Sequence, residues 1–353
     1  MSDDVKYMLD ALDRLSNKGF EFAGHRANHG PMVADALVAL GAGEAAPAWC
    51  ESYAAVDAAC RTTGFFLITG HGVPGDMMME VYRRSREFFD MPAEVKHSCH
   101  AEGHGLLGYR GMNSLRASTS SASDSPYDAK ELYSIGQEYP PAHLGAPHAE
   151  FFPPNIWPRD MAGFWAALLA YYDTMCQLTE PLGELFATAL GLPGDYFGRR
   201  SDGQLSWLVS INYPSQATTP VEPDQWRFGA HRDRSCFTIL STSGPGLEVE
   251  DAYGVWHPVP VRPDAFIVNV GSMLAGWTGG RWIAPLHRVS PPRADASPDQ
   301  ASSRRQSLGF FYSPDPTVTL DPLPTSDCGE PHTLHGHTRT VADHLRSLLG
   351  LYK

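Results

Sequence analysis

The chain is poor in cysteine and has no long apolar run. Its six cysteines, scattered over 353 residues, form no C-x-x-C pair. This pattern indicates free thiols in a reducing compartment and argues against a disulfide framework. No apolar stretch approaches the roughly 20 residues that a membrane-spanning helix needs, and the opening residues MSDDVKYMLDALDRL lack the apolar core of a signal peptide. The sequence therefore predicts a cytoplasmic protein without a membrane partner.

Basic residues are also in the minority, with 27 Lys and Arg against 40 Asp and Glu, which gives a formal net charge of −13. Broad nucleic-acid surfaces need a positive footprint, so nucleic acid is not an expected partner. A small anion is not excluded, because one or two local arginines suffice to bind it. The nucleophile motif G-x-S-x-G is absent too, which argues against an α/β-type serine hydrolase. A small-molecule ligand is the expected partner, and the oligomeric state stays open.

In the first half of the chain, the spacing of apolar residues predicts mostly helices. Residues 1–52 are expected to form a helical extension, in which 32–40 is an apolar stripe at helical spacing. Residues 53–200 predict a helix-rich part. Its expected elements are a helix through Cys60, a strand at 64–70, a helix at 76–89, a long loop at 99–127, and one helix or a helix pair at 159–191.

Residues 201–353 predict almost only strands, closed by a helix at 338–349. Short apolar segments alternate with Gly, Pro and Asp turns, a pattern typical of a β-sandwich or jelly roll. The expected strands are 205–213, 236–242, 247–250, 255–258, 265–270, 287–290, 307–312 and 317–320. The predicted fold is thus mixed α and β, with a jelly-roll core and flanking helices.

His231, Asp233 and His287 are the candidate metal ligands. His231 and Asp233 are two residues apart, so on an extended strand their side chains point the same way. His287 opens a later predicted strand, which a closed sheet can bring beside them. Two imidazoles and one carboxylate, with open positions left over, are the ligand set of non-haem Fe(II) oxygenases. An isolated H-x-D pair also arises by chance in a chain with 15 histidines and 40 acidic residues.

Arg305 and Ser307 are the candidate anion-binding pair. They are two residues apart at the start of the apolar strand that continues as LGFFY, so they share one face. A guanidinium binds a carboxylate with two hydrogen bonds, and a hydroxyl adds a third. Tyr213, at the end of an earlier strand, is either another donor to that carboxylate or a core tyrosine with its hydroxyl at the rim.

Over about residues 54–349 the chain resembles the isopenicillin N synthase-like Fe(II)/2-oxoglutarate-dependent oxygenases. The resemblance rests on GFFLITGHGVP, REFFDMPAEVK, GYRG, DAKELYSIG, INYP, GAHRDRSCFTIL, LHRV and RQSLGFFYSPDPTVTL, together with GLEVEDAYGVWHPVPVRPDAFIVNVGSML. It implies a double-stranded β-helix in which His231, Asp233 and His287 hold iron. It also implies that Arg305 and Ser307, with Tyr213 nearby, bind the distal carboxylate of 2-oxoglutarate, and that O2 is the second cosubstrate.

The sequence departs from that family in three places. The connection between His287 and Arg305 is long, so Arg304 competes with Arg305 for the carboxylate, although the R-x-S spacing favours Arg305. Arg234 stands directly after Asp233, where the family more often has an uncharged residue. The strand that usually opens the fold is missing, and residues 1–52 instead resemble, over a short stretch, part of questin-oxidase-like proteins.

The predicted function is oxidation of a small organic molecule, with secondary metabolism as the expected context, hydroxylation as the default outcome, and desaturation or cyclisation left open. Arg234 and Arg110 are candidates for contacting the substrate, against the alternative that both are solvated surface charges. Two other functions stay open. In the first, the enzyme uses iron and O2 without 2-oxoglutarate, and Arg305 binds the substrate's carboxylate. In the second, the fold is a non-catalytic binding module.

Overall fold

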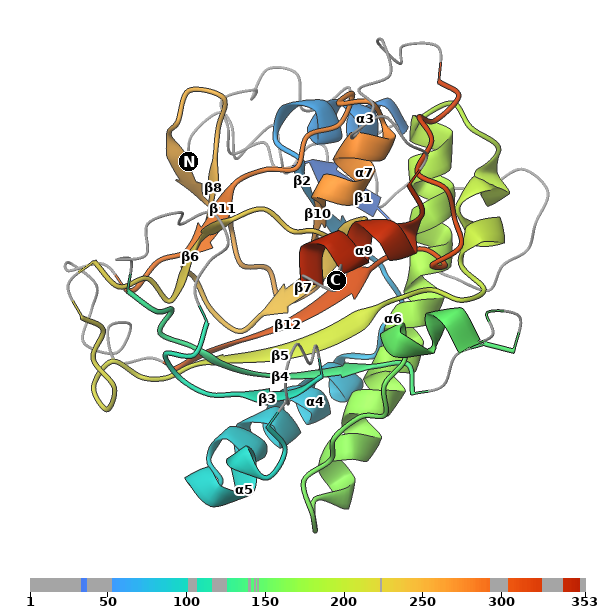
Figure 1. Ribbon diagram of the computed structural model, residues 1–353. Coiled ribbons are helices and arrows are strands. Elements are labelled where there is room, and N and C mark those ends of the chain that lie inside the picture. The colour runs from blue at the N-terminus through green and yellow to red at the C-terminus, as the bar shows by residue number, and fades with distance from the viewer. Residues whose placement is uncertain are drawn as a thin grey trace.

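Two antiparallel β-sheets and a layer of helices make up the computed structural model (Figure 1). The structure describes residues 33–36, 53–100, 107–115, 126–138, 141–142, 144, 146–222, 224–292, 304–325 and 339–349. The larger sheet has eight strands in the order β1-β2-β10-β7-β12-β5-β4-β3, and the smaller has four in the order β6-β11-β8-β9. This arrangement is the predicted jelly roll with flanking helices.

The strands are short, as expected from the spacing of turn residues. Their bounds are Val33–Ala36 (β1), Phe65–Thr69 (β2), Gly108–Arg110 (β3), Glu131–Gly136 (β4), Trp207–Tyr213 (β5), Phe228–His231 (β6), Phe237–Thr242 (β7), Leu247–Glu250 (β8), Trp256–Pro258 (β9), Ala265–Val270 (β10), His287–Val289 (β11) and Arg305–Tyr312 (β12).

Helices cover one face of the larger sheet. Their bounds are Tyr53–Thr62 (α3), Gly75–Phe89 (α4), Ala93–His97 (α5), Ala162–Ala189 (α6), Ser272–Trp277 (α7) and Val341–Leu349 (α9), with short 3-10 turns at Ala146–Phe151, Gly194–Tyr196 and Gly198–Arg200. Helices α4 and α6 pack against each other beneath the sheet (Figure 1). The main apolar core lies in this layer, where Phe88, Phe164 and Leu308 are at most 1% exposed.

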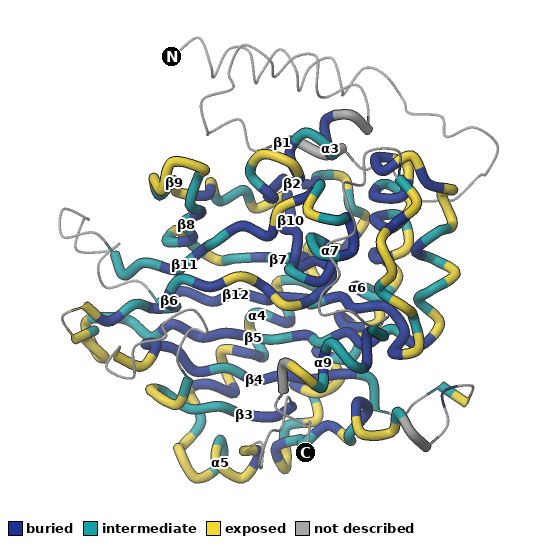
Figure 2. Tube along the Cα trace, turned by 45° about the horizontal axis from the view of Figure 1, so that its top comes forward, coloured by how far each residue is buried: buried dark blue, intermediate teal, exposed yellow. Residues whose placement is uncertain are grey.

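A second apolar core lies between the two sheets. It joins Phe65 and Ile211 of the larger sheet to Val249 and Val289 of the smaller sheet. Because successive side chains of a strand point to opposite faces, strands β2, β5 and β10 of the larger sheet contribute to both cores. Figure 2 shows these strands as the most continuously buried part of the chain.

Most of the predicted elements are confirmed. Strands β8 and β10 have the predicted bounds. The predicted ranges also overlap the following elements: β2, β5, β7, β9, β11, β12, α3, α4 and α9. Residues 162–189 form one continuous helix despite Pro181, so the helix pair is not formed. The predicted division into 1–52, 53–200 and 201–353 stays a prediction, and strands β1 to β4 join the same sheet as β5, β7, β10 and β12.

Three expectations are wrong. The stripe at 32–40, expected to be helical, contains strand β1, which pairs with β2. Pairing with the edge of the sheet outweighs the local helical spacing of the apolar residues. The rest of the 1–52 extension lies outside the described residues. The loop at 99–127 contains strand β3, which pairs with β4. Residues 317–320 form no strand, only an isolated bridge between Thr319 and Thr340. Within the described residues, no helix is both long and apolar enough to cross a membrane.

Asp57 ties helix α3 to the turn after α7 through a partly buried charge network. It accepts hydrogen bonds from Arg61 Nε (2.8 Å), Arg281 Nε (3.0 Å) and Trp282 Nε1 (2.7 Å). Burial by itself raises the pKa of Asp57, but the hydrogen bonds from Arg281, Trp282 and Arg61 outweigh it and lower the pKa below its ordinary value. A carboxyl whose pKa is lower in the folded state stabilises the fold above its unfolded pKa and loses that contribution as the pH falls.

We expect Asp57→Ala to lower the free energy of unfolding by about 2 kcal/mol at pH 7, because it leaves buried donors without an acceptor. The difference from the unchanged protein should narrow below about pH 4, where the unfolded carboxyl is protonated. Urea titrations at several pH values measure this. The exposed Glu184→Ala on α6 is the control, with a change expected within about 0.5 kcal/mol. A difference that is independent of pH would contradict the assignment.

Candidate metal centre and carboxylate site

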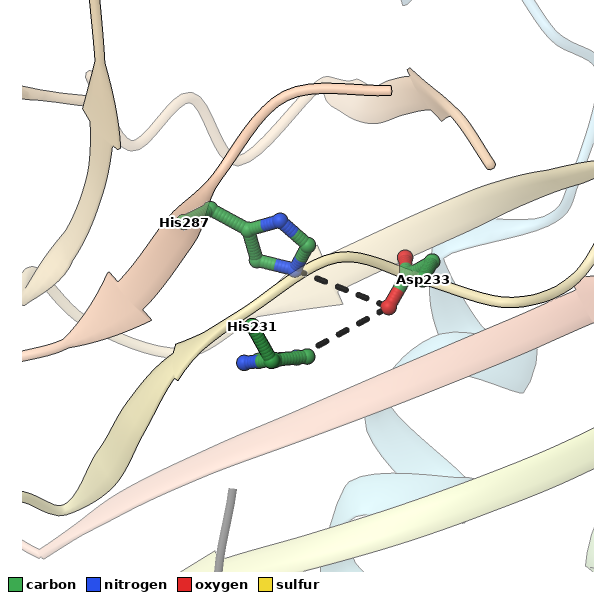
Figure 3. A group of neighbouring side chains, drawn as sticks. All are labelled: His231, Asp233 and His287. Atoms are coloured by element: carbon green, nitrogen blue, oxygen red, sulfur yellow. Dashed lines mark ion pairs between the residues drawn. The ribbon is translucent and has the colours of Figure 1, made fainter. Parts of the chain in front are cut away.

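His231, Asp233 and His287 meet between the two sheets (Figure 3). His231 ends β6 and His287 begins β11, and the two are direct cross-strand partners. Asp233 lies in the turn that follows β6, and its Oδ1 is 3.7 Å from His231 Nε2 and 3.6 Å from His287 Nε2. The ligand atoms all lie within 4.8 Å of one another, and the three residues are 6–9% exposed. The fold thus brings His287 beside His231 and Asp233, more than fifty residues earlier in the chain, to form one compact donor set.

Backbone carbonyls orient both imidazoles. His231 Nδ1 lies 2.8 Å from the carbonyl oxygen of Gly229, and His287 Nδ1 lies 3.2 Å from that of Pro285. A carbonyl can only accept, so each Nδ1 carries the proton and each Nε2 keeps its lone pair. This arrangement is the usual one for metal-binding histidines.

The carboxylate of Asp233 is held from the opposite side. Its Oδ2 accepts hydrogen bonds from Thr238 Oγ1 (2.6 Å) and Asn269 Nδ2 (2.8 Å), while Oδ1 faces the imidazoles. The backbone amide of Ser272 donates to the carbonyl of Asp233 (2.8 Å) and so fixes the turn. Gly271 is required there, because a Cβ on it would overlap the carbonyl of Ser235.

Electrostatics favour a neutral imidazole at His231 beside an ionised carboxylate at Asp233. Burial, followed by the neighbouring His287, lowers the pKa of His231 to about 3. Burial by itself raises the pKa of Asp233, but His287 and His231 outweigh it and lower the pKa below the ordinary value. Metal binding requires neutral histidine and ionised carboxylate. The donor set, two imidazole nitrogens and one carboxylate oxygen, fits Fe(II).

Arg305 and Ser307 lie on the same side of the larger sheet as Tyr213. Arg305 pairs with Tyr213 across β12 and β5, and its Cζ is 4.8 Å from the centre of the tyrosine ring. Its Nε donates to the carbonyl of Gly244 (3.1 Å) and one terminal nitrogen donates to Ser307 Oγ (2.7 Å). The other terminal nitrogen, NH2, is buried and has no hydrogen-bond partner among the described residues. A guanidinium that is 2% exposed and has an unused donor fits an acid ligand.

Arg304 does not share that position. It donates to Asn212 Oδ1 (2.5 Å) and to Asp90 Oδ1 (2.6 Å), at the end of α4. Neighbouring residues on an extended strand point to opposite faces, so Arg304 lies on the helix-facing side and Arg305 between the sheets. A cavity of about 600 Å³ lies on that helix-facing side, lined by Lys96, Arg304 and others, and includes none of the three candidate metal ligands.

Arg110 and Arg234 occupy different environments. Arg110 is half-buried on β3, where its partner is Leu132, which in turn pairs with Ile211 of the core between the sheets. Directly opposite residues share a face, so Arg110 belongs to the face that also carries the carboxylate site. Arg234 is exposed beside Asp233.

The sequence did not point to the residues that support the ligands. Thr238 and Asn269 hold Asp233, and the spacing H-x-D-x4-T was the available signal for Thr238. Arg227 was missed as well. It is 3% exposed, and burial, followed by the charge of Arg305, lowers its pKa to about 10, so a second buried guanidinium lies near Arg305. Its position four residues before His231 was the available signal.

Comparison with known proteins gives a consistent result. Residues 37–160 match the family model described as "non-haem dioxygenase in morphine synthesis N-terminal", and residues 206–314 match the 2OG-Fe(II) oxygenase superfamily. The chain is 32% identical over 275 residues to validamycin A dioxygenase from Streptomyces hygroscopicus subsp. limoneus, covering 76% of this chain and 73% of that protein. It is 30% identical over 311 residues to clavatol oxidase claD from Penicillium crustosum, covering 83% and 88%.

Solved structures share the fold. A full-length Neurospora crassa protein in complex with alpha-KG superposes with a TM-score of 0.71 at 22% identity, covering 90% of this chain and 94% of that chain. JOX2 in complex with 2OG, Fe and JA superposes with a TM-score of 0.66 at 25% identity, covering 84% and 80%. The chain belongs to the 2OG-Fe(II) oxygenase superfamily and is a non-haem Fe(II)/2-oxoglutarate-dependent dioxygenase.

Proposed function

We propose that the protein oxidises a small organic molecule in secondary metabolism, with hydroxylation as the default outcome, and that it acts in the cytoplasm. The buried donor set of His231, Asp233 and His287 carries this proposal, because its free Nε2 and Oδ1 atoms converge on one point. When bound there, Fe(II) with 2-oxoglutarate and O2 supplies the oxidising chemistry, and succinate and CO2 are the coproducts. The relatives named for validamycin A and clavatol support a small-molecule substrate.

In this proposal each side chain has a separate task. His231, Asp233 and His287 would hold iron through two imidazole nitrogens and one carboxylate oxygen. Arg305 and Ser307 bind the distal carboxylate of 2-oxoglutarate, and the unused donor of Arg305 supports that role. Tyr213 packs against Arg305 and limits the space around it. The surrounding apolar core keeps water away from the reacting atoms.

The alternatives have less support. A non-catalytic binding module does not need two imidazoles and a carboxylate held with their metal-binding atoms free. Use of iron and O2 without 2-oxoglutarate is not favoured, because relatives with the same architecture are 2-oxoglutarate-dependent dioxygenases by name. A substrate carboxylate at Arg305 then has to compete with the cosubstrate.

Loss of either histidine should abolish iron binding. We expect His231→Ala and His287→Ala each to weaken Fe(II) binding more than about 100-fold, beyond the cost of losing an outer-shell partner. Anaerobic titration measures this. His257→Ala is the matched control, because His257 also pairs with a carboxylate, that of Asp251 at 2.7 Å, but lies on β9 outside the donor set. Equal Fe(II) binding by the unchanged protein and the His231 variant would refute the metal site.

Two adjacent arginines allow a test of the carboxylate site. We expect Arg305→Gln to raise the KM for 2-oxoglutarate about 10- to 100-fold, the equivalent of losing hydrogen bonds between charged groups. Iron affinity should stay unchanged. Arg304→Gln, next in sequence but on the opposite face, should leave the KM within about twofold. Succinate formation measures both. Equal effects of the two variants, or turnover without succinate, would contradict 2-oxoglutarate binding by Arg305.

A substrate screen read out by succinate tests the function itself. With a substrate in hand, we expect Arg110→Ala and Arg234→Ala each to raise its KM while the KM for 2-oxoglutarate stays the same. The reason is that Arg234 adjoins the candidate ligand Asp233, and Arg110 lies on the sheet face that carries the carboxylate site. Arg199→Ala is the control, since its side chain is 73% exposed at a distant 3-10 turn. Unchanged substrate kinetics for either variant would remove that arginine from the substrate site.

A further inference from the structure

A buried ion pair lies beside the strand that carries His231. Lys130 Nζ is 2.7 Å from Asp128 Oδ2, and the two side chains are 2% and 4% exposed. The other carboxylate oxygen of Asp128 accepts from the amide of Gly229 (2.9 Å), and the amide of Ala129 donates to the carbonyl of Trp226 (2.9 Å). Strand β4 belongs to the larger sheet and β6 to the smaller. The segment 128–130 therefore connects the two sheets at the strand that ends in His231.

Two chains of contact lead from this pair to His231. Lys130 Nζ lies 2.7 Å from the centre of the Phe228 ring, and the same ring stacks on the imidazole of His231 at 3.8 Å and 14°. At these distances the ammonium of Lys130 and the imidazole of His231 cannot lie on the same face of the Phe228 ring. The phenyl ring therefore lies between them. The second chain runs through Gly229, whose amide is held by Asp128 and whose carbonyl receives His231 Nδ1.

The pair is costly where it lies. Removing two charges from water costs several kcal/mol per ion before their attraction is counted, and apolar residues of similar size often stabilise a fold as well or better. Burial lowers the pKa of Lys130 to about 7, although Asp128 opposes that shift. The cation–π contact of Lys130 with Phe228 and the hydrogen bond between Asp128 and Gly229 both lead to the imidazole of His231. This shared endpoint offers a reason for keeping the two charges here.

We propose that Asp128, Lys130 and Phe228 form a positioning unit that fixes the imidazole of His231 with its Nε2 directed at the iron. The unit acts through Phe228 and Gly229 and touches neither metal nor substrate. It rests on the proposed metal role of His231. Phe228 sets the plane of the ring, and Gly229 sets its rotation through Nδ1.

Glu131, which follows Lys130 and begins β4, supplies a matched control on the other face of the sheet. Lys96 Nζ is 2.8 Å from Glu131 Oε2, with side chains 14% and 5% exposed. Glu131 also accepts from Tyr109 and Asn212, at 2.6 and 2.8 Å. This pair is also a buried lysine–carboxylate contact, made by Lys96 of α5 with the first residue of β4, but it packs toward α4 and α5. Its loss should cost stability without affecting His231.

The test compares Lys130→Met, Phe228→Leu and Lys96→Met for Fe(II) affinity in anaerobic titration and for the visible spectrum of the Co(II)-loaded protein, which reports coordination geometry. We expect Lys130→Met and Phe228→Leu to weaken Fe(II) binding about 10- to 100-fold, the usual cost of losing an outer-shell partner, and to change the Co(II) spectrum. Lys130→Arg, which keeps the cation over the ring, should restore most of the affinity.

Lys96→Met should lower the midpoint of thermal unfolding as Lys130→Met does, yet leave affinity and spectrum unchanged. Wild-type affinity and spectrum in folded Lys130→Met and Phe228→Leu would overturn the positioning unit, and so would equal changes in Lys96→Met. If Lys130→Met does not fold, Phe228→Leu decides. If the unchanged protein binds no iron in a His231-dependent way, the proposed function fails, which is a separate result.

Discussion

The cross-strand pairing of His231 with His287 is the constraint on which the site depends. These residues face each other in the antiparallel ladder of β6 and β11, so the backbone hydrogen bonds of the smaller sheet determine how far apart the two imidazoles lie. The register is irregular just beyond this pair, between His287 and Val289. A slip by one residue would turn one imidazole to the other face of the sheet. Asp233 then needs only a tight turn to complete the donor set.

The larger sheet separates two kinds of surface. Its helix-facing side carries the main apolar core, and its other side faces the smaller sheet and carries Tyr213, Arg305 and Ser307. Alternation at the start of β12 assigns two neighbouring arginines to these opposite environments. Arg304, just before the strand, is held by Asn212 and Asp90, and Arg305 is held by Gly244 and Ser307. The same alternation separates Lys130, just before β4, from Glu131, the first residue of β4, so neighbouring residues form ion pairs on both sides of the sheet.

Around the donor set, neighbouring groups occupy the polar atoms that are not aimed at its centre. Backbone carbonyls accept hydrogen bonds from Nδ1 of both histidines. Thr238 and Asn269 donate hydrogen bonds to Oδ2 of Asp233. The atoms left over are the two Nε2 atoms and Oδ1, which converge. Fixing these side chains during folding removes the need to reorganise them when the metal binds. The positioning unit of Asp128, Lys130 and Phe228 extends the same principle by one layer.

The sequence by itself determined the chemistry. The spacing of His231 and Asp233, the R-x-S pair and the alternating strands predicted the fold class, the donor set and the preference for Arg305. It did not reveal β1 or β3, because edge strands are specified by the partner they pair with and not by their own pattern. Nor did it single out Lys130, Phe228, Thr238 or Asn269 as supporting residues, since each becomes meaningful only beside a residue distant in sequence. Only the tertiary structure decided these contacts, because strand register and the packing of two sheets, not local spacing, bring such residues within hydrogen-bonding distance.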